Sequence, residues 1–197
     1  MKAIHATTTP SRAAAGFTLI ELMVTVSIAA ILLAVAAPSF VAFQRNSELT
    51  SATNSLLAGI SAAKGEAMKR GLSAVIVPAS NGDWGTGWKI FVDRDRNQTF
   101  SATADTLVAE HAALPSYLTA SGTGTANGSA AYIMFDPSGY TKTAGAGFGT
   151  LTLSLARNDV ADAQLPEQTR RIVVAATGRV RTCKPATDTT CTTAATE

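Results

Sequence analysis

The chain has 197 residues, of which 46% are hydrophobic and 15% are charged, and its formal net charge is +2. This length fits one globular domain with an appendage, and the apolar content is enough for a core, which excludes a wholly disordered chain. Two histidines and two cysteines do not supply the roughly four nitrogen or sulfur ligands of a structural zinc site. We therefore expect neither a metal nor a cofactor.

The first feature along the chain is an apolar run over residues 17–37, in which Glu21 is the one charged residue. A run of this length can cross a bilayer as a helix. A polar leader, residues 1–16, precedes it, and Gly16 followed by Phe17 is a candidate cleavage site. Secretory signals are cut after their apolar stretch, whereas a cut here would come before it. The mature chain would then begin with the apolar helix.

Glu21 needs compensation inside such a helix, because a carboxylate at the bilayer centre costs about 2.5–3.5 kcal/mol on insertion scales. The new α-amino group at Phe17 of a neighbouring subunit would provide it if these helices pack side by side. The alternative is a plain signal anchor with Glu21 near the membrane surface. The residues alone leave both interpretations open.

Residues 16–22 read GFTLIEL, which resembles the N-terminal signal of type IV pilins and of type II secretion pseudopilins. The resemblance implies that a prepilin peptidase cleaves after Gly16 and methylates Phe17. It also implies a single-pass protein held in inner membrane lipid with its head in the periplasm. Assembly with other pilin subunits into a pilus or pseudopilus would then depend on Glu21.

A helical pattern resumes after Pro38 and continues over residues 38–71. From Leu49 onward its apolar side chains recur at spacings of three, four or seven, which places them on one helix face. Gly71 is typical of the residue that follows a helix C-terminus. We expect an amphipathic second half of one long helix, with Pro38 and Gly59 as places for a kink.

Residues 72–197 have the pattern of a β-rich head, because short β-branched runs alternate with turn residues. The predicted strands span residues 74–77, 89–92, 106–109, 132–135, 151–155, 172–175 and 179–182. The expected fold class is therefore α+β. A long N-terminal helix, whose first half is transmembrane, would pack on antiparallel sheets arranged as in a sandwich.

Residues 87–93 read GWKIFVD, which resembles the G-W-x-x-F-x-D segment of the FimT/GspH group of minor pilins and minor pseudopilins. We expect Trp88 in the core and leave Trp84 open. Residues 93–97 have the spacing that opens an EF-hand calcium loop, but Gln98 replaces its glycine and Ala104 its glutamate. The segment therefore predicts a charged turn and no calcium.

Neither catalysis nor free thiols are favoured by the remaining polar residues. His111 follows Glu110, but no G-x-S-x-G motif supplies a nucleophile, so we expect no enzymatic activity. In the oxidising periplasm, Cys183 and Cys191 are expected to form a disulfide that holds the threonine-rich C-terminal tail. The alternative is a pair of free thiols.

Five cations lie within 15 residues near the C-terminus, with no acidic residue among them: Arg170, Arg171, Arg179, Arg181 and Lys184. A tight turn at residues 177–178 would pair residues 172–176 with 179–183. Arg179 and Arg181 would then share one strand face, and guanidinium groups bind phosphate oxygens with two parallel hydrogen bonds. The alternative is a charged sheet edge that discourages aggregation.

Residues 178–181 read GRVR, which resembles the G-R-x-R motif of FimT-type minor pilins, proteins that bind DNA during natural transformation. The resemblance implies sequence-independent DNA binding by Gly178, Arg179 and Arg181, with Arg170, Arg171 and Lys184 nearby. The rival interpretation is a GspH-type minor pseudopilin of a type II secretion system. Such a protein would have a structural role and protein partners only.

Overall fold

The computed structural model describes residues 16–194, so residues 1–15 of the expected leader lie outside the described part. The chain forms two compact units, residues 1–43 and residues 44–197. Helix α1 (Leu19–Arg70) contributes to both units. We describe each unit by itself.

The first unit is the apolar part of α1. The Thr18 hydroxyl accepts a hydrogen bond from the Glu21 backbone N–H at 3.3 Å, and Glu21 in the first turn is favourably placed against the helix dipole. Its large apolar side chains from Phe17 to Phe43 are all exposed. Among the described residues, α1 is the one helix long and apolar enough to cross a membrane. This segment therefore fits a membrane anchor.

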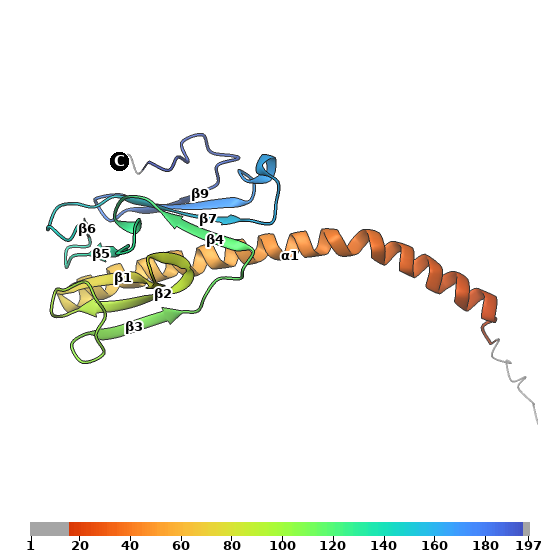
Figure 1. Ribbon diagram of the computed structural model, residues 1–197, viewed down its shortest axis with the longest axis horizontal. Coiled ribbons are helices and arrows are strands. Elements are labelled where there is room, and N and C mark those ends of the chain that lie inside the picture. The colour runs from red at the N-terminus through yellow and green to blue at the C-terminus, as the bar shows by residue number, and fades with distance from the viewer. Residues whose placement is uncertain (1–15, 195–197) are drawn as a thin grey trace, which may run out of the picture. The chain divides into compact units, whose positions relative to one another are not determined.

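The second unit combines the end of α1 with two antiparallel sheets (Figure 1). The first sheet has the order β3-β2-β1-β5-β6 and the second has the order β4-β7-β8-β9. The strands are β1 (Ser73–Ser80), β2 (Asp83–Asp93), β3 (Thr106–His111), β4 (Leu118–Gly122), β5 (Ile133–Phe135), β6 (Thr141–Lys142), β7 (Leu151–Arg157), β8 (Thr169–Val174) and β9 (Val180–Cys183). Two 3₁₀ turns, η1 (Gly124–Ala126) and η2 (Asp162–Gln164), complete the described elements.

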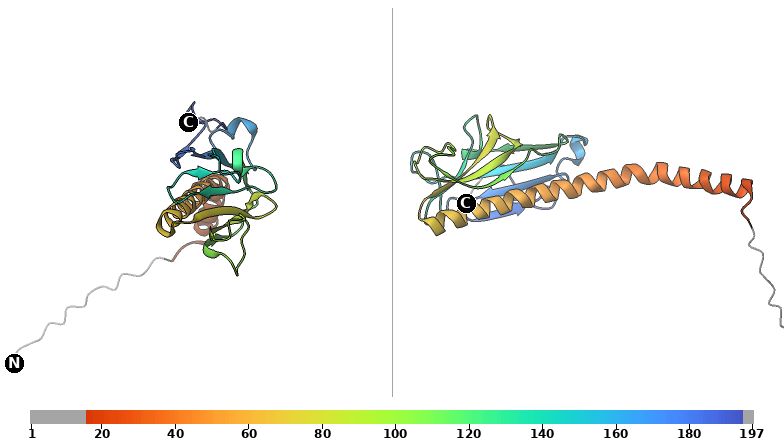
Figure 2. Two further views of the ribbon diagram at one scale, coloured as in Figure 1. Left: turned by 90° about the vertical axis from the view of Figure 1, so that its left-hand side faces the viewer. Right: turned by 90° about the horizontal axis from the view of Figure 1, so that it is seen from below.

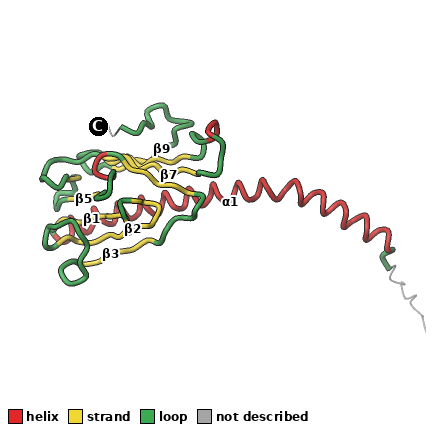
Figure 3. The backbone as a smooth tube through the Cα atoms, viewed as in Figure 1, coloured by secondary structure: helices red, strands yellow, loops and turns green. Residues whose placement is uncertain are grey.

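All seven predicted strands correspond to observed strands, and the α+β fold class is confirmed. Strands β4 and β6 were not predicted. Strand β4 has Leu118 as its one large apolar residue, and β6 has only two residues, so neither has a strong alternating pattern. Figure 3 shows the short strands of the head connected by loops.

One core joins the predicted apolar face of α1 to the inward sides of both sheets. Leu49, Leu56 and Ile60 of the helix are fully buried there, and Figure 2 shows the helix running alongside the strands. Burying a leucine or isoleucine stabilises a fold by about 1.5–3 kcal/mol. The helix ends as predicted, because Gly71 follows it with a φ of +66°, in the left-handed region that favours glycine.

The helix continues through Pro38 and Gly59, so neither residue interrupts it. Gly59 instead permits close packing on β2. A Cβ atom there would lie 3.0 Å from Ile90 Cδ1 and 3.3 Å from Trp88 Nε1. Trp84 and Trp88 are both buried, which confirms the prediction for Trp88 and answers the question left open for Trp84.

Asp159, just after β7, forms a buried ion pair with Arg157 and a second ion pair with α1. The Arg157 side chain is only 6% exposed, and its Nε and Nη2 atoms each lie 2.8 Å from one carboxylate oxygen of Asp159. Arg45 on the helix forms a further ion pair with Asp159. Hydrogen bonds from Arg157, with a contribution from Arg45, hold the pKa of Asp159 well below its usual range.

Candidate nucleic-acid interface

The hairpin that presents the C-terminal cations is formed by β8 and β9. The two strands pair as predicted, but the register is shifted by one residue, so that Arg171 pairs with Cys183 and Val173 with Arg181. The turn lies one residue earlier than predicted, because the Gly178 N–H donates to the Ala175 carbonyl at 2.8 Å and makes Ala176 the first central residue. Gly178 follows the turn with a φ of +73° and so supplies the bulge typical of three-residue hairpin loops.

Gly178 is required at this position for a second reason. A Cβ atom there would lie 1.9 Å from the carbonyl oxygen of Gly139, in the loop before β6. The Gly178 carbonyl accepts a hydrogen bond from Lys64 Nζ of α1 at 2.8 Å. The turn is therefore fixed to both the helix and the first sheet. Arg179, which comes next, is exposed to solvent.

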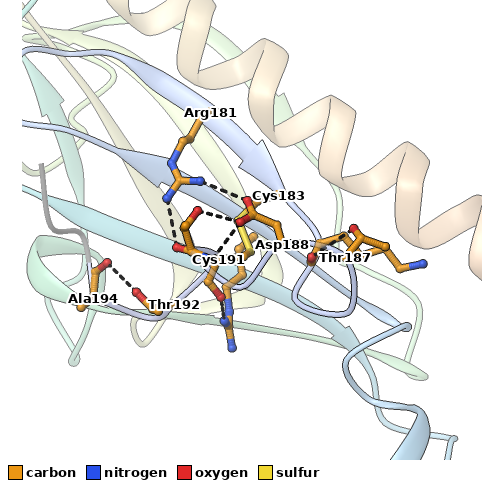
Figure 4. Close-up of polar contacts among 10 residues, drawn as sticks. Arg181, Cys183, Thr187, Asp188, Cys191, Thr192 and Ala194 are labelled. Carbon is orange, nitrogen blue, oxygen red and sulfur yellow. Dashed lines mark hydrogen bonds and ion pairs between the residues drawn. A yellow bond between two sulfur atoms is a disulfide. The ribbon is translucent and has the colours of Figure 1, made fainter.

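Arg171 and Arg181 lie on the face of the second sheet that points away from the core. Ile172, which follows Arg171 in β8, is buried in the core, and successive residues of a strand point to opposite faces of a sheet. The C-terminal tail folds over this face (Figure 4). Arg171 donates a hydrogen bond to the Cys191 carbonyl. Arg181 Nη2 donates to the Thr190 carbonyl at 3.3 Å.

The predicted disulfide between Cys183 and Cys191 is confirmed, and their Cα atoms lie 5.7 Å apart. It closes the loop that carries Asp188, whose Oδ2 lies 3.5 Å from Arg181 Nη1. Hydrogen bonds from Thr190 lower the pKa of Asp188, so this group is a carboxylate at neutral pH. The tail therefore places one negative charge next to one of the two arginines of the motif.

Arg170 and Lys184 contribute to a different surface. Arg170 Nη2 donates to the Asn46 side chain on α1 at 3.2 Å, and Lys184 forms an ion pair with Glu167. Both line a groove of about 290 Å³ beside the helix, together with Thr50, Thr53, Asn54, Thr182 and Cys183. The five cations are therefore divided among the turn, the tail-covered face and this groove. A linear sequence does not reveal this division, because the pairing acids lie outside the cationic stretch.

Three carboxylates lie together at the end of β2. Ligand oxygen atoms of Asp93, Asp95 and Asp105 all lie within 4.8 Å of one another. Asp93 accepts hydrogen bonds from the backbone N–H groups of Asn97 and Gln98, at 3.2 and 3.0 Å. Asp105, which the sequence motif did not include, does the same for Arg94 and Ser101. We explain the cluster as the support of the predicted charged turn, in which burial raises the pKa of Asp93.

The residues considered for catalysis are engaged in packing. His111 stacks on Trp88 with ring centroids 4.0 Å apart, and Glu110 lies 3.5 Å from Lys89 Nζ. Both pairs join β3 to β2. This arrangement supplies no nucleophile to either residue within the described part of the chain.

Comparison with known protein families identifies the family to which this chain belongs. A model described as the type II transport protein GspH matches residues 52–178, which is more than half of the chain. The chain belongs to the GspH family. The matched span includes the whole GWKIFVD segment, so the sequence resemblance is confirmed at the level of the pilin and pseudopilin family.

The N-terminus matches a second model, the prokaryotic N-terminal methylation motif, over residues 11–37. No curated relative matches this GspH-family chain by sequence. Two solved structures are similar to it, both crystal forms (space groups P21 and P65) of the type IV minor pilin FimU from Pseudomonas aeruginosa strain PAO1. At 20% identity their TM-scores are 0.53 and 0.51, and the alignments cover 73% and 70% of this chain and 94% of the FimU chain. This likeness shows the fold.

The GspH match ends at Gly178, immediately before Arg179. Membership of the GspH family therefore accounts for the end of α1 and for strands β1 to β8, and for a chain that is a minor pilin or pseudopilin. This membership gives no information on Arg179 and Arg181, which lie beyond the matched residues. What these cations bind has to be argued from their own surroundings.

Proposed function

We propose that this GspH-family protein is a minor type IV pilin of FimT type, which binds DNA without regard to sequence and supports DNA uptake in natural transformation. The observation that carries the proposal is the exposed Arg179 on a turn fixed by Gly178 and Lys64. The turn fixes the backbone next to Arg179, so the binding of a phosphate has to order only the side chain. Phosphate contacts carry no base information, so binding is independent of sequence.

Arg181, Arg171, Arg170 and Lys184 extend this cationic site in the proposal. Each has an intramolecular partner that accepts its hydrogen bonds. DNA therefore competes with the tail and with Glu167 for these groups. In the proposal, Arg179 on the turn and these four cations contact the DNA backbone together.

The N-terminal part of the proposal follows from the methylation motif. A prepilin peptidase cleaves after Gly16 and methylates Phe17. Until assembly, the protein is held in inner membrane lipid with its head in the periplasm. The helix then joins other pilin subunits in the filament through Glu21. Glu21 is exposed in the isolated chain, as a residue that meets its partner in another subunit should be.

Replacing Glu21 with alanine should leave membrane insertion intact and prevent most incorporation into pili. The variant has no buried charge to oppose insertion, but it has lost the group that pairs with the neighbouring α-amino group. Immunoblots of sheared pili and of membranes measure the two pools. Ser27→Ala is the matched control, because Ser27 lies in the same segment and its hydroxyl donates only to the Met23 carbonyl. Wild-type incorporation of Glu21→Ala would contradict the proposed role.

DNA binding is tested on the full chain in a nonionic detergent. Duplexes of unrelated sequence should bind with dissociation constants in the same range, roughly 10⁻⁴–10⁻⁶ M. The logarithm of the association constant should fall with the logarithm of salt concentration by about 0.9 for each phosphate contacted. The proposal fails if the chain binds neither these duplexes nor single-stranded DNA at low salt.

Replacing Asp188 with asparagine should strengthen DNA binding by up to about fivefold, because an exposed ion pair is worth at most about 1 kcal/mol. The change frees Arg181 from a competing charge and leaves the disulfide in place. Fluorescence anisotropy with a labelled duplex measures the change. Asp162→Asn removes one exposed carboxylate elsewhere and serves as the control for net charge. If both variants gain equally, the tail has no specific effect on the arginine.

The second candidate is a GspH-type minor pseudopilin of a type II secretion system, in which the cations stabilise the head. The pairing of Arg181 with Asp188 and of Lys184 with Glu167 favours it. Deleting the gene separates the two candidates. Loss of DNA uptake with normal protein secretion supports the pilin, and the opposite result supports the pseudopilin.

A further inference from the structure

Two aromatic side chains are exposed together on the head, next to a lysine. Phe148 is 63% exposed, the highest value among the large apolar side chains described in residues 44–194, and Tyr140 is 42% exposed. Their ring centroids lie 5.7 Å apart. Lys142 Nζ lies 4.0 Å from the centroid of the Phe148 ring. We call Tyr140, Lys142 and Phe148 the aromatic patch.

The pleat of strand β6 explains why the patch points outward. Lys142 faces Phe148 across an isolated bridge, and Tyr140 lies two residues before Lys142, on the same side. Thr141 between them is buried, and its hydroxyl donates to the Ala175 carbonyl at 2.8 Å. The rings are therefore held at the surface by backbone geometry, although burying them would be favourable.

The aromatic patch adjoins the turn that carries Arg179. The Thr141 N–H donates to the Ala176 carbonyl at 3.2 Å, within the β8–β9 turn. The Gly139 carbonyl oxygen, next to Tyr140, would lie 1.9 Å from a Cβ atom at Gly178 of the same turn. Asp136 lies 3.6 Å from Lys142 Nζ, and residues 137–158 contain no further acid. Exposed rings and cations thus share one region of the head.

We propose that the aromatic patch stacks unpaired bases, so that the DNA bound at this site is single-stranded; this inference rests on the DNA binding proposed above. Aromatic rings beside cations suit single strands, because every base offers a flat face and every nucleotide a phosphate. In a duplex the base faces are stacked on each other. Tyr140 and Phe148 hold the base, and Lys142 and Arg179 hold the backbone.

The test uses the full chain in a nonionic detergent and compares three probes of equal length: oligothymidylate, a strand whose residues are abasic, and a duplex. The abasic strand keeps its phosphates and lacks bases. The wild-type protein should bind oligothymidylate about tenfold more tightly than the abasic strand, since base stacking on one ring contributes about 1–3 kcal/mol. It should also prefer oligothymidylate to the duplex.

The variant Tyr140→Leu/Phe148→Leu keeps the apolar volume and removes the aromatic faces. Its affinity for oligothymidylate should fall about tenfold, to that of the abasic strand, with unchanged affinity for the abasic strand itself. Leu107→Ala, at an exposed apolar residue on β3, is the control and should change neither affinity. Thermal unfolding of each variant confirms that the head is folded.

Equal wild-type affinity for oligothymidylate and the abasic strand would overturn the stacking inference, while DNA binding itself would stand. A folded double-leucine variant that retains the base preference would also overturn it. If that variant instead loses incorporation into pili, the patch is a contact between subunits. A wild-type chain that binds none of the three probes contradicts the proposed function itself.

Discussion

Replacing Arg179 and Arg181 together with alanine is expected to reduce DNA affinity by at least about tenfold for every sequence tested. A hydrogen bond to a charged group contributes about 1.5–3 kcal/mol, and one factor of ten corresponds to about 1.4 kcal/mol. Each lost phosphate contact should also flatten the salt dependence by about one unit. Arg179→Ala and Arg181→Ala should each weaken binding, and the double variant should lose more affinity than either single variant.

Lys69→Ala is the control for this experiment. Lys69 lies in the same unit, its side chain is 72% exposed, and its partner Glu66 keeps a second ion pair with Arg70. The control removes one positive charge and should leave affinity within a factor of about two, as for an exposed charge at a distance. A folded double variant that binds DNA like the wild type would identify the motif as a charged sheet edge. The pseudopilin interpretation would then be preferred.

Replacing Asp159 with alanine should lower the free energy of unfolding by about 3 kcal/mol, because it breaks the buried ion pair that Arg157 makes with two hydrogen bonds. We expect a value at the lower end of the range for breaking a buried ion pair. Asp159 is 19% exposed, and Gln168, 3.5 Å from Arg157 Nη1, remains as a partner for the arginine. Urea unfolding of the full chain in detergent measures the loss. The near-ultraviolet signal of the buried tryptophans reports on the head.

The effect should depend on pH. Folding lowers the pKa of Asp159. The contribution of its carboxylate to the stability of the fold is therefore complete above the pKa of about 4 that it has in the unfolded chain. It is lost as the pH falls from there through the lower pKa of the folded state. The difference between wild type and Asp159→Ala should therefore shrink below about pH 4. Arg157→Met/Asp159→Ala should recover most of the stability, and Asp162→Ala should change it little.

The sequence predicted the elements whose side chains follow a regular period. The face of α1 from Leu49 to Ala67 and the seven strands come from apolar spacing, which is a local property of the chain. Glycine predicted the end of α1 at Gly71 and the approximate place of the β8–β9 turn. The turn lies one residue earlier than predicted, because Ala176 and Thr177 form its centre and Gly178 occupies the bulge that follows it.

The candidate site was predicted less completely, because its state depends on residues distant in sequence. The cationic stretch shows neither Glu167 beside Lys184 nor Asn46 beside Arg170. Asp105 joins Asp93 only because β3 returns beside β2. The one signal of the tail contact was the disulfide, since closing residues 183–191 forces Asp188 back towards its own strand.

The hydrogen bond from Lys64 to the Gly178 carbonyl has a mechanical consequence. If DNA is pulled while it is held at Arg179, the load enters the head one residue from Gly178 and can pass directly to α1, the element that continues into the apolar segment. The route avoids the disulfide loop and most of the second sheet. Lys64→Met would remove this hydrogen bond and should lower the rupture force of the complex by more than the static affinity for DNA. Single-molecule pulling should then show rupture of the complex at lower force.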